Sequence, residues 1–282
     1  MRVAVSVEST NDLSKELLIK YDIEVIPYHI TLGEKTYRDG EISTQDMFDF
    51  VAENKILPKT NAINEYEYVD YFTQLKREYD AVVHICLSSD LSSSCGNAMR
   101  ASKSVENVYV VDSRSLSTGI GLCAIYAREL ADKGIAPEEI AKKVEERANS
   151  LQVSFVVERL DYLHKGGRCS SLQRFGANLL HLRPRIVVKD GKMSSDKKYK
   201  GKMASVMSKY CNDVLEEFNT PDLDKVFITY TSATPEMIAS AEAVCREAGF
   251  KNIYQTTAGC TITSHCGEHT MGILYFNDGV KE

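Results

Sequence analysis

A run of short hydroxylated residues at positions 88–94 (SSDLSSS) follows an apolar segment and precedes a helical pattern. Hydroxyls and backbone N–H groups at a helix N-terminus bind anions well, because the helix dipole adds partial positive charge there. Simple capping of the helix by Ser92 or Ser93 is an equally good interpretation. The run could also supply a nucleophilic serine, although it lacks the G-x-S-x-G pattern.

A second candidate is the segment Lys165–Arg168 (KGGR). Its two glycines permit a close approach of the backbone or a positive φ. Its arginine could form a bidentate pair with a carboxylate or a phosphate. For this segment taken alone, a helix C-cap followed by a surface arginine is the favoured interpretation.

Cysteine and histidine gather near the end of the sequence, at Cys260, His265, Cys266 and His269. These residue types bind zinc, but the spacing C-x4-H-C-x2-H matches no paired zinc motif. His265 by itself could donate a hydrogen bond in a polar site, or it could serve a structural role. The sequence contains no Walker lysine loop, no G-x-G-x-x-G and no H-E-x-x-H.

The elements that must position these residues alternate between strands and helices in the first half of the chain, which predicts βαβ units and a mostly parallel sheet. The predicted strands are Val3–Val7, Ile23–Thr31, Ala81–Leu87 and Val108–Asp112. The predicted helices lie near residues 13–18, 43–54 and 66–79, and a fourth follows the serine run and ends near residue 105. A long helix is predicted to start near Ser117 and another near Pro137. Thr36–Gly40 is expected to be a turn and residues 58–64 a loop. Polar loops follow Val7, Leu87 and Val111, at the strand ends where such sheets bind ligands.

The pattern changes after residue 152. Strands are predicted at Val153–Val157, Ile186–Lys189, Lys192–Tyr199, Val226–Thr231, Ile253–Thr256 and Met271–Phe276. Asp190-Gly191 joins two of them as a hairpin, which favours a mixed sheet. The fold class is therefore α/β with two domains: residues 1–151 with a mostly parallel sheet and flanking helices, and residues 152–282 with a mixed sheet.

Composition excludes several classes of protein. The chain has 282 residues, with 34 Lys+Arg against 40 Asp+Glu, so its formal net charge is −6. An acidic chain is a poor default binder of nucleic acid. No secretory signal and no integral membrane segment are recognisable. Eight cysteines without a C-x-x-C pair do not resemble a disulfide framework, so a cytoplasmic location is expected.

Taken together, the segments resemble the DegV family of bacterial fatty-acid-binding proteins, and the match extends over most of the chain. The matching segments are Val7–Ser9 (T-D-S in the family), Asp39-Gly40, Pro58–Asn64 (P-x-T-S-Q-P-S), Ser88–Cys95 (S-S-x-L-S-G-T-Y), Val108–Ser113, Leu160–Arg168 (L-x-Y-L-x-K-G-G-R), Leu180–Pro184, Asp190-Gly191 and His265–Gly267. The segment Leu160–Arg168 is the most specific. The chain departs from the family pattern at Glu8, Asn61, Ile63, Ser93, Ser94 and Cys95.

The resemblance implies a carrier that binds a long-chain fatty acid, with the carboxylate at the domain interface and the tail in an apolar tunnel. The carboxylate-binding residues carried over by position are Thr60, Asn61, Ser92, Ser93, Arg168 and His265. The carrier would need no cofactor and no metal, and it would present its ligand to a separate fatty acid kinase rather than catalyse a reaction itself.

Two alternatives from other classes remain open. One is a serine hydrolase acting on acyl esters through Ser92 and His265, with an aspartate such as Asp112 completing a triad. The other is a binding module stabilised by zinc at the late Cys/His cluster.

Overall fold

The computed structural model describes residues 1–169 and 182–280. Its N-terminal half, up to residue 148, is built on a four-stranded sheet in which every neighbouring pair of strands is parallel. The strands of this sheet, in spatial order, are β2 (Ile23–Ile26), β1 (Val3–Glu8), β6 (Ala81–Cys86) and β7 (Val108–Asp112). All residues of β1 and β6 are buried, as expected for central parallel strands with helices on both faces.

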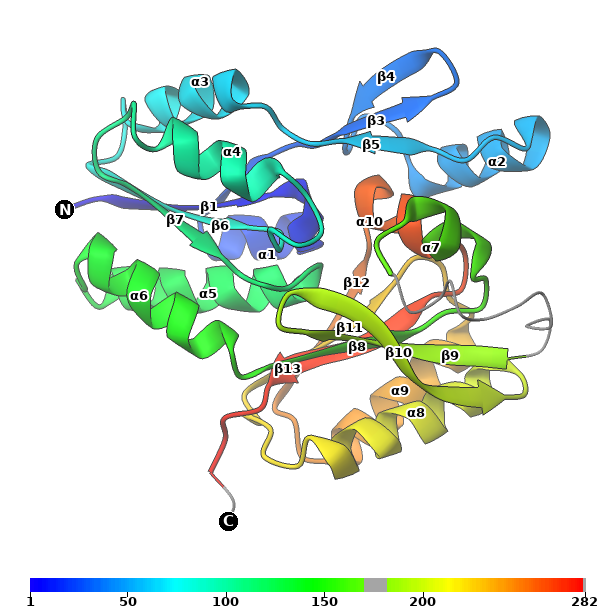
Figure 1. Ribbon diagram of the computed structural model, residues 1–282. Coiled ribbons are helices and arrows are strands. Elements are labelled where there is room, and N and C mark those ends of the chain that lie inside the picture. Colours follow the sequence, from blue (N-terminus) through cyan, green and yellow to red (C-terminus); the bar gives the residue numbers. More distant parts are fainter. Residues whose placement is uncertain (170–181, 281–282) are drawn as a thin grey trace.

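Helices cover both faces of this sheet, and Figure 1 shows α3 and α4 on one face and α5 and α6 on the other. The helices of this half are α1 (Lys15–Lys20), α3 (Glu65–Leu75), α4 (Ser94–Ala101), α5 (Thr118–Asp132) and α6 (Pro137–Ala148). Asn64 caps α3 with a capping box, and Pro137 occupies the first turn of α6, where its missing N–H is tolerated. Among the described residues, none of the helices has both the length and the apolar character needed to cross a bilayer.

A small antiparallel sheet extends from the N-terminal half, and its existence was not predicted. Its strands are β4 (Lys35–Arg38), β3 (His29–Leu32) and β5 (Lys59–Asn61), with α2 (Thr44–Asn54) beside them (Figure 1). The predictions of one strand over Ile23–Thr31, a turn at Thr36–Gly40 and a loop at 58–64 are therefore wrong in detail. The long strand breaks at Pro27, which has no N–H to donate to a ladder. The next N–H, that of Tyr28, donates to Ser9 Oγ instead, at 3.0 Å.

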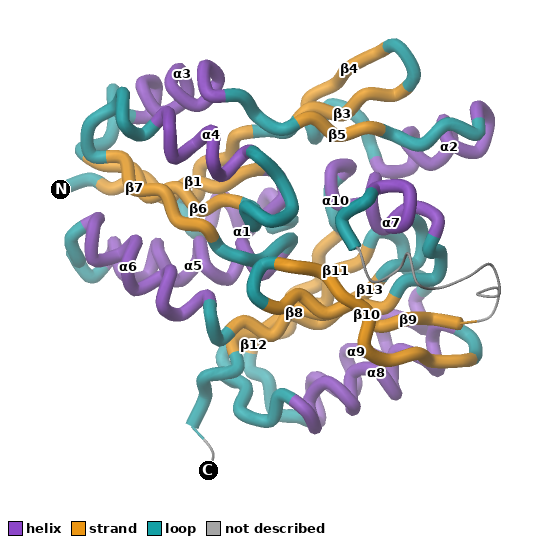
Figure 2. The backbone as a smooth tube through the Cα atoms, viewed as in Figure 1, coloured by secondary structure: helices purple, strands orange, loops and turns teal. Residues whose placement is uncertain are grey.

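The C-terminal half, from β8 onward, contains a mixed six-stranded sheet. Its strands in spatial order are β10 (Lys192–Lys200), β9 (Leu182–Lys189), β8 (Leu151–Val156), β13 (Met271–Phe276), β11 (Lys225–Tyr230) and β12 (Asn252–Thr257). The pair β11 and β12 is parallel, and the other neighbouring pairs are antiparallel. Helices α8 (Met203–Glu217) and α9 (Pro235–Glu247) pack together beneath it (Figures 1 and 2).

These sheets confirm the predicted α/β class, with a parallel sheet in the N-terminal half and a mixed sheet in the C-terminal half. The domain boundary after residue 151 stays a prediction, and it falls one residue inside β8. Leu180, one end of a family-like motif, lies outside the described residues.

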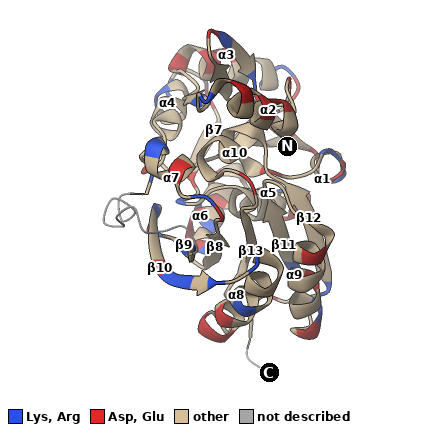
Figure 3. Cartoon of the chain, turned by 90° about the vertical axis from the view of Figure 1, so that its right-hand side faces the viewer, with Lys and Arg blue, Asp and Glu red and all other residues tan. Residues whose placement is uncertain are grey.

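Strand β10 forms one edge of the six-stranded sheet, and Figure 3 shows Lys and Arg along it. Its exposed lysines are Lys192, Lys197, Lys198 and Lys200. Charged side chains on an edge strand oppose pairing with the edge of another molecule. The lysines of β10 are therefore explained by protection of the edge.

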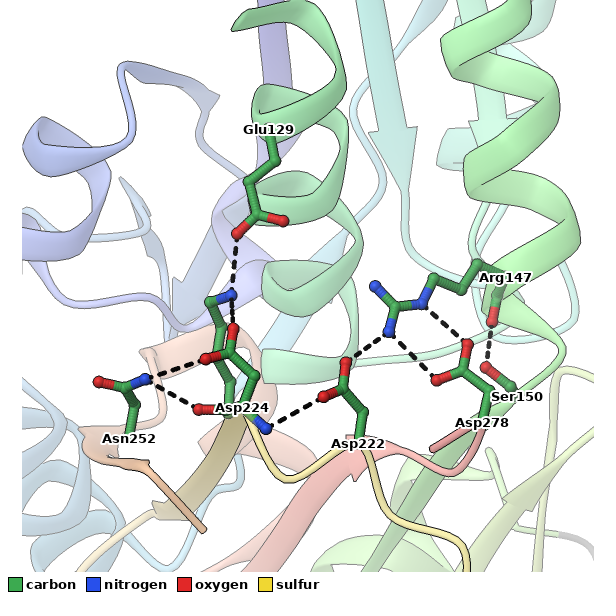
Figure 4. Close-up of polar contacts among 8 residues, drawn as sticks. Glu129, Arg147, Ser150, Asp222, Asp224, Asn252 and Asp278 are labelled. Carbon is green, nitrogen blue, oxygen red and sulfur yellow. Dashed lines mark hydrogen bonds and ion pairs between the residues drawn. The ribbon is translucent and has the colours of Figure 1, made fainter. Parts of the chain in front are cut away.

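Ion pairs join the two halves of the molecule, as Figure 4 shows. Arg147, at the end of α6, donates to Asp222 at 2.6 Å and to Asp278 at 2.9 Å. Lys225, at the start of β11, pairs with Glu129 of α5 at 2.8 Å. Because Arg147 and Lys225 are mostly buried, these pairs are less screened by solvent than surface pairs are. They fix the helices of the N-terminal half against the start of the C-terminal sheet.

A short helix makes the second connection between the halves. Helix α10 (Cys260–Cys266) belongs to the C-terminal half, but its N-terminal N–H groups meet carboxylates of the N-terminal half. Gly259 N donates to Asp12 Oδ1 at 2.8 Å. Cys260 N and Thr261 N donate to Asp39 at 3.0 and 3.2 Å. Carboxylates are favourable at this position because the first turn of a helix leaves its N–H groups without intrahelical partners.

Burial shifts the pKa of one of these two residues, Asp12. Desolvation, together with the negative charge of Asp39, raises the pKa of Asp12 to about 8, although the Ser117 hydroxyl and Gly259 N–H both donate to it. The folded protein therefore holds a proton that the unfolded chain releases at a much lower pH.

The Asp12→Asn variant tests this assignment. Because the folded pKa is raised, the Asp12 contribution to stability is complete below the unfolded pKa of about 4 and is lost as the pH rises through the folded value. In the parent protein the free energy of unfolding should therefore decrease as the pH rises from about 4 to 8. Replacement of Asp12 by Asn should make this decrease less steep by up to about 1.4 kcal/mol per pH unit. Urea denaturation of both proteins across this range measures the slopes. Identical slopes would contradict a protonated Asp12.

Candidate functional site

A cavity of about 100 Å³ lies where loops of the N-terminal half meet α7 (Asp161–Gly166) and α10. We call it the serine cavity. Its polar lining residues are Tyr28, Thr60, Ser92, Ser93, Arg168, Thr261 and His265, and the buried Thr261 hydroxyl has no hydrogen-bond partner among the described residues. Its apolar lining includes Leu87, Leu91, Leu116, Met193, Ile262 and Cys266. Five of the six residues predicted for the site therefore line one cavity, and they come from both halves of the chain.

Ser92 sits in the loop between β6 and α4, with its hydroxyl held from two sides. Its Oγ accepts a hydrogen bond from Tyr28 Oη at 3.0 Å and one from Ser94 N at 3.2 Å. Ser93 is the N-cap residue of α4, is exposed, and makes no side-chain capping bond. Ordinary N-capping, the alternative interpretation of this serine run, therefore does not describe Ser93.

Thr60 and His265 meet across the cavity. Thr60 Oγ1 lies 2.8 Å from His265 Nε2, although the two residues are 205 positions apart in the sequence. Burial, with a smaller effect of the nearby Arg168 charge, lowers the pKa of His265 to about 4, so the imidazole is neutral at physiological pH. Its Nδ1 is buried and has no hydrogen-bond partner among the described residues.

The glycines before Arg168 have separate structural roles. A Cβ on Gly166 would lie 2.6 Å from His265 Nδ1, so only glycine lets α7 approach the imidazole this closely. Gly167 ends α7 in the left-handed region, with φ of +69°. Arg168 follows at the exposed rim, where its Nη1 donates to Gly166 O at 2.6 Å. The remaining N–H groups of the guanidinium leave it with donors for an anion.

Asn61 is the one predicted site residue that does not line the cavity. Strand β5 alternates its side chains, so Thr60 faces the cavity while Asn61 is exposed and donates to Thr31 Oγ1 at 3.1 Å. Two other departures from the family pattern, Ile63 and Cys95, are fully buried in the core. Sequence reasoning missed Tyr28, whose position directly after Pro27 gave no signal of a site.

A smaller apolar cavity of about 30 Å³ adjoins the serine cavity. The two share Leu116, Ile262 and Cys266, and the neighbouring cavity continues between Phe155 and Leu274. The hydroxyls of its serine and threonine residues, Ser117, Thr229, Thr231 and Thr270, are already bonded to protein atoms. These bonds include Thr118 with Thr229 at 2.7 Å, Thr231 to Gly267 O at 2.6 Å and Thr270 to Cys266 O at 2.9 Å. An apolar group that enters from the serine cavity would therefore leave few polar atoms without a hydrogen-bond partner.

Three larger hollows, of about 540, 710 and 340 Å³, lie elsewhere on the described part of the molecule. Their walls carry charged side chains that are already engaged with protein atoms. Glu158 pairs with Arg183 at 2.9 Å, and Arg114 donates to the backbone carbonyl of Asp190 at 2.7 Å. They are more polar than the serine cavity and the apolar cavity beside it, and we do not assign the site to them.

The side chains of the late Cys/His cluster do not point toward a common position for a metal ion. Cys260 Sγ donates to the Ile42 carbonyl, His265 Nε2 faces Thr60, and His269 Nε2 lies 3.8 Å from a Glu158 carboxyl oxygen. Within the described residues, the group whose ligand atoms come within metal-binding reach is Glu8, His84 and Cys86. Its members are buried and already bonded to protein atoms, with Tyr68 donating to Glu8 and Ser6 meeting His84 Nδ1.

The residues imagined as a hydrolase triad are not assembled either. Ser92 bonds to Tyr28 and Ser94, while His265 bonds to Thr60. Asp112 accepts from the backbone N–H groups of Ser89 and Arg114. In the described structure no carboxylate orients His265, and His265 does not reach the Ser92 hydroxyl. The arrangement lacks the hydrogen-bonded chain that activates a serine nucleophile.

Comparison with known proteins identifies the family of this chain. A family model described as "Uncharacterised protein, DegV family" matches residues 2–278. A Thermotoga maritima protein named fatty acid-binding protein is 30% identical over 281 residues, covering 96% of each chain. Among solved structures, a fatty-acid-binding DegV family protein from Thermus thermophilus superposes with a TM-score of 0.88 at 25% identity, covering 98% of this chain and 99% of its own.

A second solved structure is DegV from Bacillus subtilis, described as a fatty acid binding protein. It has a TM-score of 0.85 and 28% identity, and the match covers 98% of this chain and 99% of that one. Because the family model and these relatives match almost the whole length, the chain belongs to the DegV family.

Proposed function

We propose that this protein binds a long-chain fatty acid, with the carboxylate in the serine cavity and the tail in the neighbouring apolar cavity. The observation that carries the proposal is the convergence of Ser92, the Thr60–His265 pair and Arg168 on one cavity whose lining is otherwise mostly apolar. The fatty-acid-binding relatives support the same ligand class.

The chemistry of the mouth suits a carboxylate. A carboxylate accepts several hydrogen bonds and carries one negative charge, so it needs hydroxyl donors and a cation. Ser92 and Thr60 of the N-terminal half provide hydroxyls, and Arg168 of the C-terminal half provides the cation. The ligand would therefore bridge the two halves of the molecule.

The tail would supply most of the binding energy. About 14 methylenes at about 0.8 kcal/mol each give about 11 kcal/mol of transfer free energy when fully buried. The two cavities, of about 100 and 30 Å³, would have to widen around the tail for this burial to be complete. Loss of translational and rotational freedom offsets part of this gain. The remainder is compatible with a ligand that survives purification.

The protein acts as a carrier in this proposal and performs no catalysis of its own. Arg168 and Ser93 lie exposed at the rim, so the carboxylate end of the ligand would face an approaching partner. That partner would be a separate fatty acid kinase, as the family resemblance implies. The carrier would present the fatty acid to the kinase in the cytoplasm. The unassembled triad argues against the alternative of a serine hydrolase.

Protein purified from a bacterial host should carry a long-chain fatty acid. Native mass spectrometry and solvent extraction of fresh protein would detect it. Added fatty acid at about 100 times its Kd should stabilise delipidated protein by about 2.7 kcal/mol and raise the melting temperature. Absence of both bound lipid and thermal shift would overturn the proposed function.

Two neighbouring residues of β5 provide a matched pair. Thr60→Val keeps the side-chain volume but removes the hydroxyl, so it should weaken fatty-acid binding roughly 10- to 100-fold. Asn61→Ala alters an exposed side chain outside the cavity and should bind like the parent protein. Calorimetric titration of both folded variants measures the difference. Equal affinities would remove Thr60 from the site.

The two glycines before Arg168 provide a second pair. Gly166→Ala places a methyl group against the His265 imidazole, so it should weaken ligand binding. Gly167→Ala meets no atom within 4 Å but strains a left-handed residue, so it should lower stability by about 1 kcal/mol and largely spare affinity. Urea denaturation and calorimetry on each variant separate the two effects. The opposite pattern would contradict the assigned roles.

A further inference from the structure

The acceptor positions of the Ser92 hydroxyl are occupied inside the protein. A serine oxygen has two lone pairs and one proton. Tyr28 Oη donates to Ser92 Oγ at 3.0 Å, and Ser94 N donates to the same oxygen at 3.2 Å. With both lone pairs engaged, the group that Ser92 has left to offer a ligand is its O–H, as a donor.

Tyr28 is held firmly in the position that produces this arrangement. Its side chain is 2% exposed, its N–H donates to Ser9 Oγ at 3.0 Å, and its carbonyl accepts from Asp39 N at 2.8 Å. Burial and the nearby Glu8 carboxyl raise the pKa of Tyr28 well above its ordinary value, so the phenol keeps its proton. Ser94 Oγ, the neighbouring hydroxyl, already accepts from Ile63 N at 3.0 Å.

We infer that Tyr28 is a positioning residue that turns Ser92 into a pure hydrogen-bond donor, and that it thereby selects an ionised carboxylate over a head group that must donate. The inference rests on the proposed function and extends it to a residue without a direct bond to the ligand. A carboxylate accepts from Ser92 without conflict. The hydroxyl of a fatty alcohol has a proton of its own, for which Ser92 has no free lone pair.

The preference comes from contacts within the protein. Tyr28 and Ser94 both donate to the Ser92 oxygen, so the direction left for the Ser92 proton does not depend on the ligand. Removal of the Tyr28 hydroxyl would free one lone pair of Ser92. The serine could then either donate or accept, and the discrimination between acid and alcohol would weaken.

The test compares lauric acid with lauryl alcohol on delipidated protein by calorimetric titration. The ratio of the two affinities is measured for the parent protein, Tyr28→Phe, Ser92→Ala and the double variant. Tyr28→Phe should lower the acid-to-alcohol ratio roughly three- to tenfold. In the Ser92→Ala background the same change should leave the ratio unaltered, because Tyr28 acts through Ser92.

Tyr275→Phe is the matched control. It also removes a buried tyrosine hydroxyl, one that donates to the Phe218 carbonyl at 2.9 Å outside the cavity, and it should leave the ratio unchanged. An unaltered ratio in Tyr28→Phe, with a parent protein that binds lauric acid, would overturn the inference while leaving the proposed function intact. The inference would also be overturned if Tyr28→Phe lowered the acid-to-alcohol ratio equally in the parent protein and in the Ser92→Ala variant, since Tyr28 would then act independently of Ser92. A parent protein that binds no fatty acid would overturn both.

Discussion

The capping of α10 by Asp12 and Asp39 is the interaction on which the candidate site depends. The helix is short and belongs to the C-terminal half, yet its first N–H groups donate to side-chain oxygens of Asp12 and Asp39 in the N-terminal half. This connection brings His265, at the far end of the helix, to within 2.8 Å of Thr60. The ion pairs of Arg147 and Lys225 fix the halves at a second place, so contacts of the protein itself hold the two walls of the cavity together.

The electrostatics of the interface follow from the burial of these groups. Desolvation raises the pKa of Asp12 to about 8 and that of Glu8 to about 7, and it lowers the pKa of His265 to about 4. Neutral forms are thereby favoured behind the cavity, while the charge of Arg168 stands at the exposed rim. An anion at the mouth would meet a cation and hydroxyl donors, and an apolar tail would lie against neutral surroundings.

Much of this arrangement could be predicted from the sequence. Apolar runs and turn residues located most strands, and the order of the motifs pointed to Thr60, Ser92, Arg168 and His265, which the fold brings to one cavity. The small antiparallel sheet was not predicted because its strands are short and polar and because Pro27 divides an apolar run between two sheets. Asn61 was included because a motif gives adjacency in sequence, whereas a strand points adjacent side chains to opposite faces. Tyr28 reaches Ser92 across 64 positions, a contact that no local pattern reports.

A crystal structure with a fatty acid brominated at its terminal carbon would test the account most directly. The carboxylate would appear in the ordinary electron density, and the anomalous signal of bromine would locate the tail end. The account predicts the carboxylate within hydrogen-bond distance of Ser92 and Thr60, with bromine in the neighbouring cavity between Phe155 and Leu274. A carboxylate outside the serine cavity, or a tail that leaves the mouth toward solvent, would contradict it.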